Sequence, residues 1–305
     1  MRGLFYTDIH VSGQNPRNRI DDYPRAIIEK LRETYQIAVD KKCDFILFGG
    51  DFFDTHKIYS YDIISEAIEI ISDSPLETYC IIGQHDLRGY NPSTYDQSAF
   101  GFVQKHCKNF HVIWERMEIE QCVLYPCHVW DDFDEVVKMD LDDEKPTIML
   151  AHHLLSKDLH MFDIIQTSSI EKCDFDIVLS GDLHTGYDPH TIDGTLFANP
   201  GSLCRKTKAD KDRDPRVLLF EMKKGKTRAK FIDLKCAGDS EKVFRKSIID
   251  DVYEKPEFDI TGFAENVNDL EAESVDIFDV ITKTAKVNKI DKKVLNYILS
   301  KRIDE

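Results

Sequence analysis

The feature that most constrains the fold is a run of four apolar residues, Phe45–Phe48, followed by Gly49, Gly50 and Asp51. A continuous apolar run of this length that ends at glycine is typical of a central strand in a sheet covered on both faces. Glycine has no Cβ, so the backbone can turn sharply and bring the Asp51 carboxylate out at the carboxyl end of the strand. Ligands bind at that edge of open α/β sheets, although a single aspartate after a strand is more often a turn former.

The residues around this strand predict alternating strands and helices. An apolar strand at 4–7 precedes a helix that Asp21 or Asp22 can cap, and the strand at 45–48 follows directly. Such a β–α–β unit implies a parallel pair of strands. A second helix over 61–72 and further strands at 78–82, 147–151 and 176–180 continue the pattern. We therefore expect an α/β fold.

Four further expected strands end in acidic, amide or imidazole side chains. These are Asp8 and His10, Gln84 and His85, His152 and His153, and Asp182 and His184. Parallel strands would bring all of them to one edge, where imidazoles mixed with carboxylates suit Mn, Fe or Zn. The donors outnumber the needs of one ion, so we expect two ions about 3.5–4 Å apart that share a carboxylate. Without metal, so many such groups in one place would demand solvation.

Composition limits the classes of protein that the chain can belong to. It has 305 residues with a net charge of −16, and no apolar run approaches the roughly 20 residues that span a bilayer. The N-terminus lacks the apolar region of a secretory signal. Eight scattered cysteines without a Cys-x-x-Cys pair favour reduced thiols in the cytoplasm over a disulfide framework or zinc ribbon. Residues 201–230 hold eleven Lys or Arg against four Asp or Glu, which leaves room for one phosphate-attracting face.

The order of these motifs resembles the signature of calcineurin-like metallophosphoesterases across roughly residues 1–235. The Gly-Gly-Asp-Phe-Phe-Asp variant, with Asn199-Pro-Gly-Ser-Leu after the last motif, is most similar to SbcD-like nuclease subunits of DNA double-strand-break repair complexes, of bacterial or phage type. The resemblance implies a four-layer α/β/β/α sandwich over 1–237 and a small, mainly helical C-terminal region over 238–305. It implies a metal-dependent DNA exonuclease or endonuclease in DNA repair or recombination.

The resemblance also assigns roles to individual residues. Asp51 would bridge two divalent ions, with manganese favoured, and these would activate a water for in-line attack on phosphorus. His85 would protonate the leaving oxygen, and Asp54 would hold the ring of His85 in the working tautomer. The implied metal ligands are Asp8, His10, Asp51 and His184 at the first site, and Asp51, Gln84, His152 and Asp182 at the second.

Two positions depart from the family pattern. Gln84 stands where the family has Asn, and Asp182 stands where it has the first His of Gly-His-x-His. Both can still ligate, and a carboxylate in place of an imidazole hardens the second site toward Mn or Mg. His152, which directly follows its strand, is favoured over His153 as the ligand. Asp54 could instead be a simple helix cap, and Asp86 could equally cap the next helix or touch the site.

Substrate and partners follow from the resemblance alone. A nuclease would use basic residues to neutralise DNA phosphates, and the alternative is that these residues form an ordinary solvated loop. The candidates are Arg17, Arg19, Arg88, Arg205, Lys206, Lys208, Lys211, Arg213 and Arg216. An SbcC-like ABC-type coiled-coil ATPase would dock on helices after residue 260, in the cytoplasm or, for a phage protein, the host cytoplasm. A homodimer stays open. The alternatives in function are a small-molecule phosphodiesterase or phosphatase, and a non-catalytic binding module with a degenerate metal site.

Overall fold

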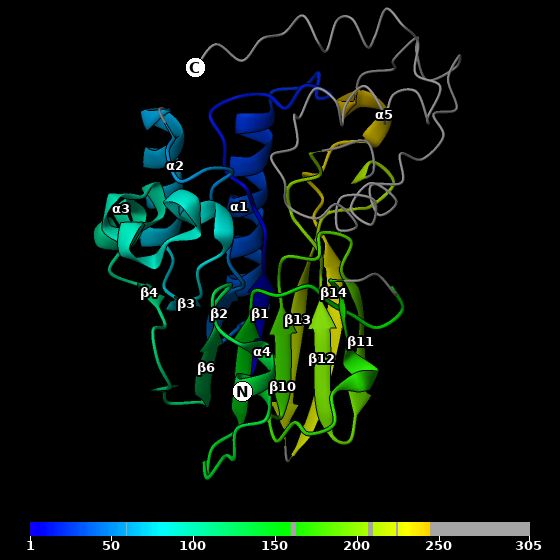
Figure 1. Ribbon diagram of the computed structural model, residues 1–305. Coiled ribbons are helices and arrows are strands. Elements are labelled where there is room, and N and C mark those ends of the chain that lie inside the picture. Colours follow the sequence, from blue (N-terminus) through cyan, green and yellow to red (C-terminus); the bar gives the residue numbers. More distant parts are fainter. Residues whose placement is uncertain (59, 160–162, 207–209, 224, 245–305) are drawn as a thin grey trace, which may run out of the picture. The chain divides into compact units, whose positions relative to one another are not determined.

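In the computed structural model the chain divides into two units, residues 1–246 and 247–305, and Figure 1 shows the helices and strands of the first. The second unit, and with it most of the predicted helical region at 238–305, lies outside the described residues, so that prediction and the expected boundary at 237 stay predictions. The structure describes residues 1–58, 60–159, 163–206, 210–223 and 225–244.

The first of two large sheets is mostly parallel. Its strands β1, β2, β3 and β4 are parallel neighbours, and β13 pairs with β1 in the antiparallel sense. The strand order is β14 (Lys226–Asp233), β13 (Arg216–Lys223), β1 (Arg2–Tyr6), β2 (Phe45–Phe48), β3 (Thr78–Cys80) and β4 (Phe110–Val112). The predicted β–α–β unit is therefore present, and the apolar run forms its second strand, between β1 and β3.

The second large sheet is built the same way from the later part of the chain. Its parallel core is β12, β10, β7 and β6, flanked by antiparallel β11 and β5. The strand order is β11 (Tyr187–Ile192), β12 (Thr195–Asn199), β10 (Ile177–Ser180), β7 (Thr147–Ala151), β6 (Val123–Cys127) and β5 (Met117–Glu118). A separate pair joins β8 (Leu155–Ser156) and β9 (Ile165–Gln166).

Helices cover the outer face of the first sheet. The longest helix among the described residues is α1 (Tyr23–Asp40), which is capped by Asp22; the Asp22 side chain accepts a hydrogen bond from the backbone N–H of Arg25. The remaining helical elements of the described ranges are α2 (Tyr61–Ser72), α3 (Ala99–His106), α4 (Phe133–Val137), α5 (Ser240–Val243) and the short 3₁₀ turns η1 (Gln84–Asp86), η2 (Arg88–Tyr90), η3 (Pro92–Gln97) and η4 (Thr167–Ser169). Within the described ranges, no helix has the length and hydropathy to span a membrane.

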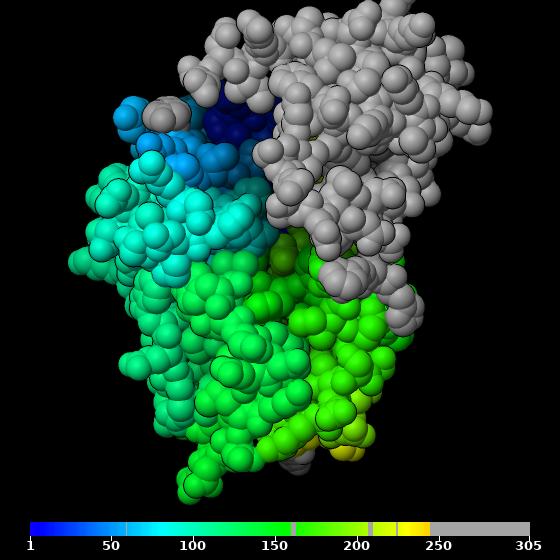
Figure 2. All heavy atoms as spheres, viewed as in Figure 1, coloured from blue at the N-terminus to red at the C-terminus, as the bar shows by residue number. Residues whose placement is uncertain are grey.

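Alternating side chains of the strands place the core in three layers. Leu4 and Tyr6 of β1 pack against α1, α2 and α3, whereas Phe5 between them faces the second sheet. The far side of the second sheet packs on α4 and irregular segments. Figure 2 shows cyan segments next to the green segments that follow them on one face of this unit. The predicted α/β/β/α sandwich is confirmed, with a thin fourth layer.

Candidate metal centre

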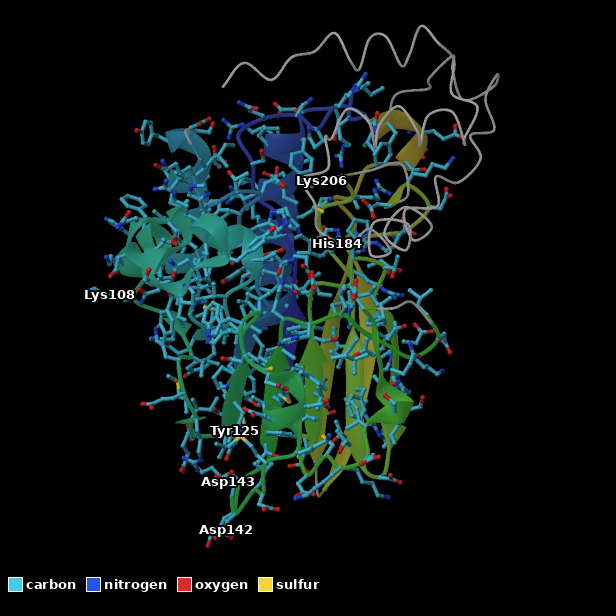
Figure 3. All side chains as sticks on the ribbon, in the orientation of Figure 1. Lys108, Tyr125, Asp142, Asp143, His184 and Lys206 are labelled. Carbon is cyan, nitrogen blue, oxygen red and sulfur yellow. The ribbon has the colours of Figure 1, made fainter. Side chains whose placement is uncertain are left out.

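The expected functional residues gather at the carboxyl ends of parallel strands from both sheets. Asp8, Asp51 and Gln84 follow β1, β2 and β3, whereas His152 and Asp182 follow β7 and β10. Figure 3 shows His184 at this end of the strands and Asp143, in the loop before β7, at the opposite end. The two sheets therefore contribute ligands to one site, as the topology of parallel strands predicts.

The backbone at these strand ends is held in an uncommon conformation. Asp8, His10, Asp51 and Asp182 have φ angles of 50°, 48°, 57° and 67°, and they make up half of the non-glycine residues with positive φ in the described part of the chain. Such conformations cost of order 1–3 kcal/mol each and cluster at functional sites. Gly83 allows the close approach that this requires, because a Cβ there would lie 2.1 Å from Asp51 Oδ1.

Three of these side chains and His184 form a first cluster of donors. His10 Nε2 lies 3.0 Å from His184 Nε2, and both nitrogens lie within 4.0 Å of Asp8 Oδ1. His10 Nε2 is also 3.8 Å from Asp51 Oδ2. Burial lowers the pKa of His10 well below its ordinary value, which keeps the imidazole neutral and able to ligate.

A second cluster lies on the other side of Asp51. His152 Nε2 is 3.5 Å from Asp51 Oδ2, and His152 Nδ1–H donates to the carbonyl of Gly49 at 2.7 Å, which fixes the tautomer with Nε2 facing the site. Burial would lower the pKa of His152, but Asp51, Asp8 and Asp182 raise it to about 10, so a cation that binds at Nε2 would displace a proton from this imidazole. Groups of the opposite sign act on Asp51: burial raises its pKa, yet His152, His10 and His85 hold that pKa below its usual range.

Buried polar atoms without partners show that these clusters suit cations. Asp51 Oδ2, Gln84 Oε1 and His152 Nε2 are buried, and none has a hydrogen-bond partner among the described residues. Buried polar groups are normally satisfied, so donor atoms left over in this way fit a bound cation. These two oxygens and the imidazole nitrogen are suitable ligands for a divalent cation. A second cation site is offered on the other side of the Asp51 carboxylate by His10, His184 and Asp8.

His85 contacts a different atom of Asp54 from the one expected from the sequence. His85 Nδ1–H donates to the backbone carbonyl of Asp54 at 2.9 Å, so the main chain and not the Asp54 carboxylate fixes the tautomer. The carboxylate instead pairs with Lys206 and lies 3.8 Å from His10 Nδ1. His85 Nε2 lies 3.9 Å from Asp51 Oδ2 on a side chain that is 41% exposed. This arrangement leaves Nε2 free to meet a substrate.

Comparison with known proteins agrees with the geometry. The sequence profile described as calcineurin-like phosphoesterase matches residues 1–186. The chain belongs to this family. Among solved structures its fold is similar to a dimetal phosphatase from Danio rerio (9% identity, TM-score 0.51, covering 76% of this chain and 96% of that one) and to the purple acid phosphatase PPD1 from yellow lupin seeds (12%, 0.50, 76% and 51%). No curated protein shows significant sequence similarity.

The adjacent histidines His152 and His153 of this phosphoesterase make different contacts. His153 Nε2–H donates to the carbonyl of His128 at 3.0 Å, away from the donor clusters, whereas His152 faces them. His128 is itself buried: its Nδ1 accepts from the N–H of Ile82, and its Nε2–H donates to the carbonyl of Ile113. Burial lowers the pKa of His128 to about 4. His152 is thus the histidine placed to ligate, and that it does so stays a prediction.

Sequence reasoning left the role of Asp86 open, and the structure gives it a structural one. Its carboxylate accepts four backbone N–H groups, from Asp51 (3.0 Å), Phe52 (2.9 Å), Phe53 (3.1 Å) and Gly83 (3.2 Å). It therefore caps its own short turn and at the same time fixes the turn that carries Asp51. Its place directly after Gln84-His85 was the only signal in the sequence, and that signal cannot reveal partners 33 to 35 residues away.

The Asn199-Pro-Gly-Ser turn locks the first cluster in place. Ser202 Oγ–H donates to the backbone carbonyl of Asp8 at 2.7 Å, and the Ser202 N–H donates to the carbonyl of His184 at 3.0 Å. Asn199 Oδ1 accepts from the N–H of Gly201 at 2.7 Å, and φ is +79° at this glycine. The turn thus ties the end of β1 to the loop that carries His184.

Several of the basic residues proposed as phosphate contacts serve the fold instead. Arg19 and Arg205 are buried; Arg19 donates to the carbonyl of Arg205 and pairs with Asp21. Arg216 lies 3.7 Å from the ring centroid of Phe231. Lys208 lies outside the described residues, whereas Arg17, Arg88 and Lys211 are exposed. Lys206 is one basic residue that the structure places beside the cluster, against Asp54, and Figure 3 shows it at the same end of the strands as His184.

Proposed function

We propose that this metallophosphoesterase is a two-metal DNA nuclease of the SbcD-like type, with an exonuclease or endonuclease activity in DNA repair or recombination. The observation that carries the nuclease proposal is the Asn199–Ser202 turn, which is tied to Asp8 and to the His184 loop. It is one of the two motif variants by which the sequence resembles that nuclease group, and here it stabilises the donor cluster directly. Hydrolysis of a phosphoester is the activity of the family as a whole.

The side chains divide the work of hydrolysis between them. The bound ions, for which we propose manganese, would supply Lewis-acid stabilisation of the phosphoryl oxygens and an activated water. His85, whose Nδ1–H is committed to the Asp54 carbonyl, has Nε2 available to give a proton to the leaving oxygen. Asp51 sits between the clusters, 3.5 Å from His152 Nε2 and 3.8 Å from His10 Nε2, and would hold both ions.

DNA binding would rely on a few cations at the edge of an acidic protein. The exposed Arg17, Arg88 and Lys211, together with Lys206, are the described candidates for contacts with backbone phosphates. Each such contact releases counterions, so affinity should fall as salt rises. The SbcC-like ATPase and a homodimer are proposed partners; the helices expected to dock the ATPase lie outside the described residues.

The test compares cleavage of linear duplex and single-stranded DNA by Mn²⁺-loaded wild type and three variants. Asp51→Ala should abolish cleavage because both clusters lose a ligand, and His85→Ala should reduce it by about 10²–10⁴-fold as expected for loss of a general acid. His106→Ala is the control, because this imidazole stacks on Phe102 at the exposed end of α3. Cleavage that survives both site substitutions would reject the mechanism.

The alternative keeps the chemistry and changes the substrate. The phosphatases that share the fold leave open a phosphatase or a small-molecule phosphodiesterase. Parallel assays on DNA and bis-p-nitrophenyl phosphate, each with a salt titration, separate the two. A rate on DNA that ignores salt, or hydrolysis of the small ester alone, would favour the alternative. No hydrolysis, together with well under one ion per chain after Mn²⁺ loading, would favour a non-catalytic binding module.

A further inference from the structure

The two residues that depart from the family pattern contact each other. Gln84 Nε2 donates to Asp182 Oδ1 at 2.7 Å, although the residues are 98 positions apart and follow strands of different sheets. Gln84 stands in η1 after β3, and Asp182 follows β10. The longer amide of glutamine bridges the two sheets and ends on a carboxylate. The two side chains therefore form one unit, which we call the amide–carboxylate pair.

The charge of Asp182 determines how the amide is turned. An ionised carboxylate can only accept hydrogen bonds, so the NH₂ group of Gln84 and not its carbonyl must face it. Gln84 Oε1 is thereby turned away from Asp182, and it is buried without a partner in the described structure. Asp182 is held from its other side, because its backbone N–H donates to both oxygens of Asp8 at 3.1 and 3.2 Å. Asp182 Oδ1 thus orients the amide, and Oδ2 is the oxygen that would serve in the ligand role implied for Asp182.

The donors of the two clusters consequently differ in chemical character. The second cluster offers oxygens from Asp51, Gln84 and Asp182 and a single nitrogen from His152. The first cluster offers Asp8 and Asp51 oxygens and two imidazole nitrogens, from His10 and His184. Carboxylate and carbonyl oxygens suit Mg²⁺ and Mn²⁺, whereas imidazole suits Zn²⁺ and other borderline metals.

We propose that the amide–carboxylate pair sets the metal preference of the second site. With Gln84 and Asp182 in contact, that site is rich in oxygen and disfavours Zn²⁺ relative to Mn²⁺, so the protein works as a nuclease with a hard cation in its second position. This inference rests on the proposed two-metal function. It predicts that the two residues act as a unit. Substitution of either residue alone leaves its partner without its hydrogen bond, whereas substitution of both gives a second metal site with a different set of ligands.

The experiment measures metal binding without DNA. Isothermal titration gives the dissociation constants of the second Mn²⁺ and the second Zn²⁺, and electron paramagnetic resonance detects the coupled Mn²⁺ pair. Gln84→Asn and Asp182→His should each weaken binding of the second Mn²⁺ by tenfold or more. The double variant Q84N/D182H should bind two ions again, with the preference for Zn²⁺ over Mn²⁺ raised at least tenfold above wild type.

Two control variants carry the same kinds of substitution away from the amide–carboxylate pair, and they show whether such substitutions by themselves change metal binding. Gln121→Asn shortens a surface glutamine that contacts Glu120, and Asp193→His places histidine at an exposed position whose φ (49°) is positive, as it is at Asp182. Both should leave the two dissociation constants unchanged. Thermal unfolding in EDTA confirms that every variant is folded before titration; for a single variant that does not fold, the double variant, which fills both positions with metal ligands, decides the proposal.

The outcomes for the pair and for the nuclease are separable. The same Zn²⁺ to Mn²⁺ preference in wild type and the double variant would overturn the role of the pair, whatever the protein does to DNA. Effects of the single variants that simply add in the double variant would also overturn it, because a unit requires coupling. The expected preferences combined with no cleavage of DNA would refute the proposed function and leave the metal assignment standing.

Discussion

Asp86 offers the sharpest test of how the site is held together, because its four hydrogen bonds divide evenly between its two oxygens. Oδ1 accepts from the N–H groups of Phe52 and Phe53, and Oδ2 accepts from those of Asp51 and Gly83. Asp86→Asn keeps the shape but turns one acceptor into an NH₂ donor. Whichever way the amide is turned, two buried N–H groups lose their acceptor.

The expected loss follows from that count. Each buried donor left without a partner costs about 1–3 kcal/mol, so two of them should lower the free energy of unfolding by about 2–6 kcal/mol. That is a large share of the roughly 5–15 kcal/mol by which proteins are stable. Asp96→Asn is the control: this exposed aspartate pairs with Lys105 at 2.9 Å, and such surface pairs are worth at most about 1 kcal/mol.

The assay is urea unfolding in EDTA, so that metal binding does not add to the stability of either protein. Asp86→Asn should show a lower midpoint with an unchanged slope. A loss below about 1 kcal/mol, no larger than for the control, would refute the view that Asp86 fixes the turn that carries Asp51.

Three further predictions concern other parts of the site. Ser202→Ala should lower the free energy of unfolding by about 1–3 kcal/mol in urea unfolding, since the Asp8 carbonyl loses its buried donor; an unchanged midpoint would argue against the turn as a lock. Mn²⁺ at 100 times its dissociation constant should stabilise the wild type by about 2.7 kcal/mol in thermal unfolding and should stabilise Asp51→Ala far less; equal stabilisation would place the ion elsewhere. Burial lowers the pKa of His128 from 6.5 to about 4, so His128 binds a proton more readily in the unfolded chain than in the folded one. The neutral ring therefore contributes up to about 3 kcal/mol to the free energy of unfolding above pH 6.5, and this contribution is lost as pH falls to 4. The stability of His128→Asn should therefore depend less steeply on pH over that window, and slopes that match the wild type would contradict the assignment.

The strand ends could be predicted from the sequence because their geometry is local. An apolar run closed by glycine and followed by Asp51 predicts both the strand and the edge at which the carboxylate appears, and parallel pairing brings Asp8 to the same edge. His152 could also be favoured over His153 from the sequence, because it directly follows its strand and neighbouring residues of an extended chain point to opposite sides.

Contacts between distant segments could not be predicted in this way. Nothing in the local sequence indicates that Gln84 reaches Asp182, or that Asp86 collects amides from the Asp51 turn. The atom that orients His85 was predicted wrongly because sequence identifies side chains, whereas here a backbone carbonyl accepts the hydrogen bond and the Asp54 carboxylate pairs with Lys206. The burial of Arg19 and of Arg205 was likewise not predicted, because arginines that stand near other basic residues in the sequence suggest an exposed surface.

The most direct test of the central claim is a crystal structure of the protein soaked in Mn²⁺, with anomalous scattering recorded at the manganese edge. The account predicts two peaks about 3.5–4 Å apart, both in contact with Asp51, one beside His10 and His184 and the other beside Gln84, His152 and Asp182. A single peak, or two peaks that do not share Asp51, would contradict it.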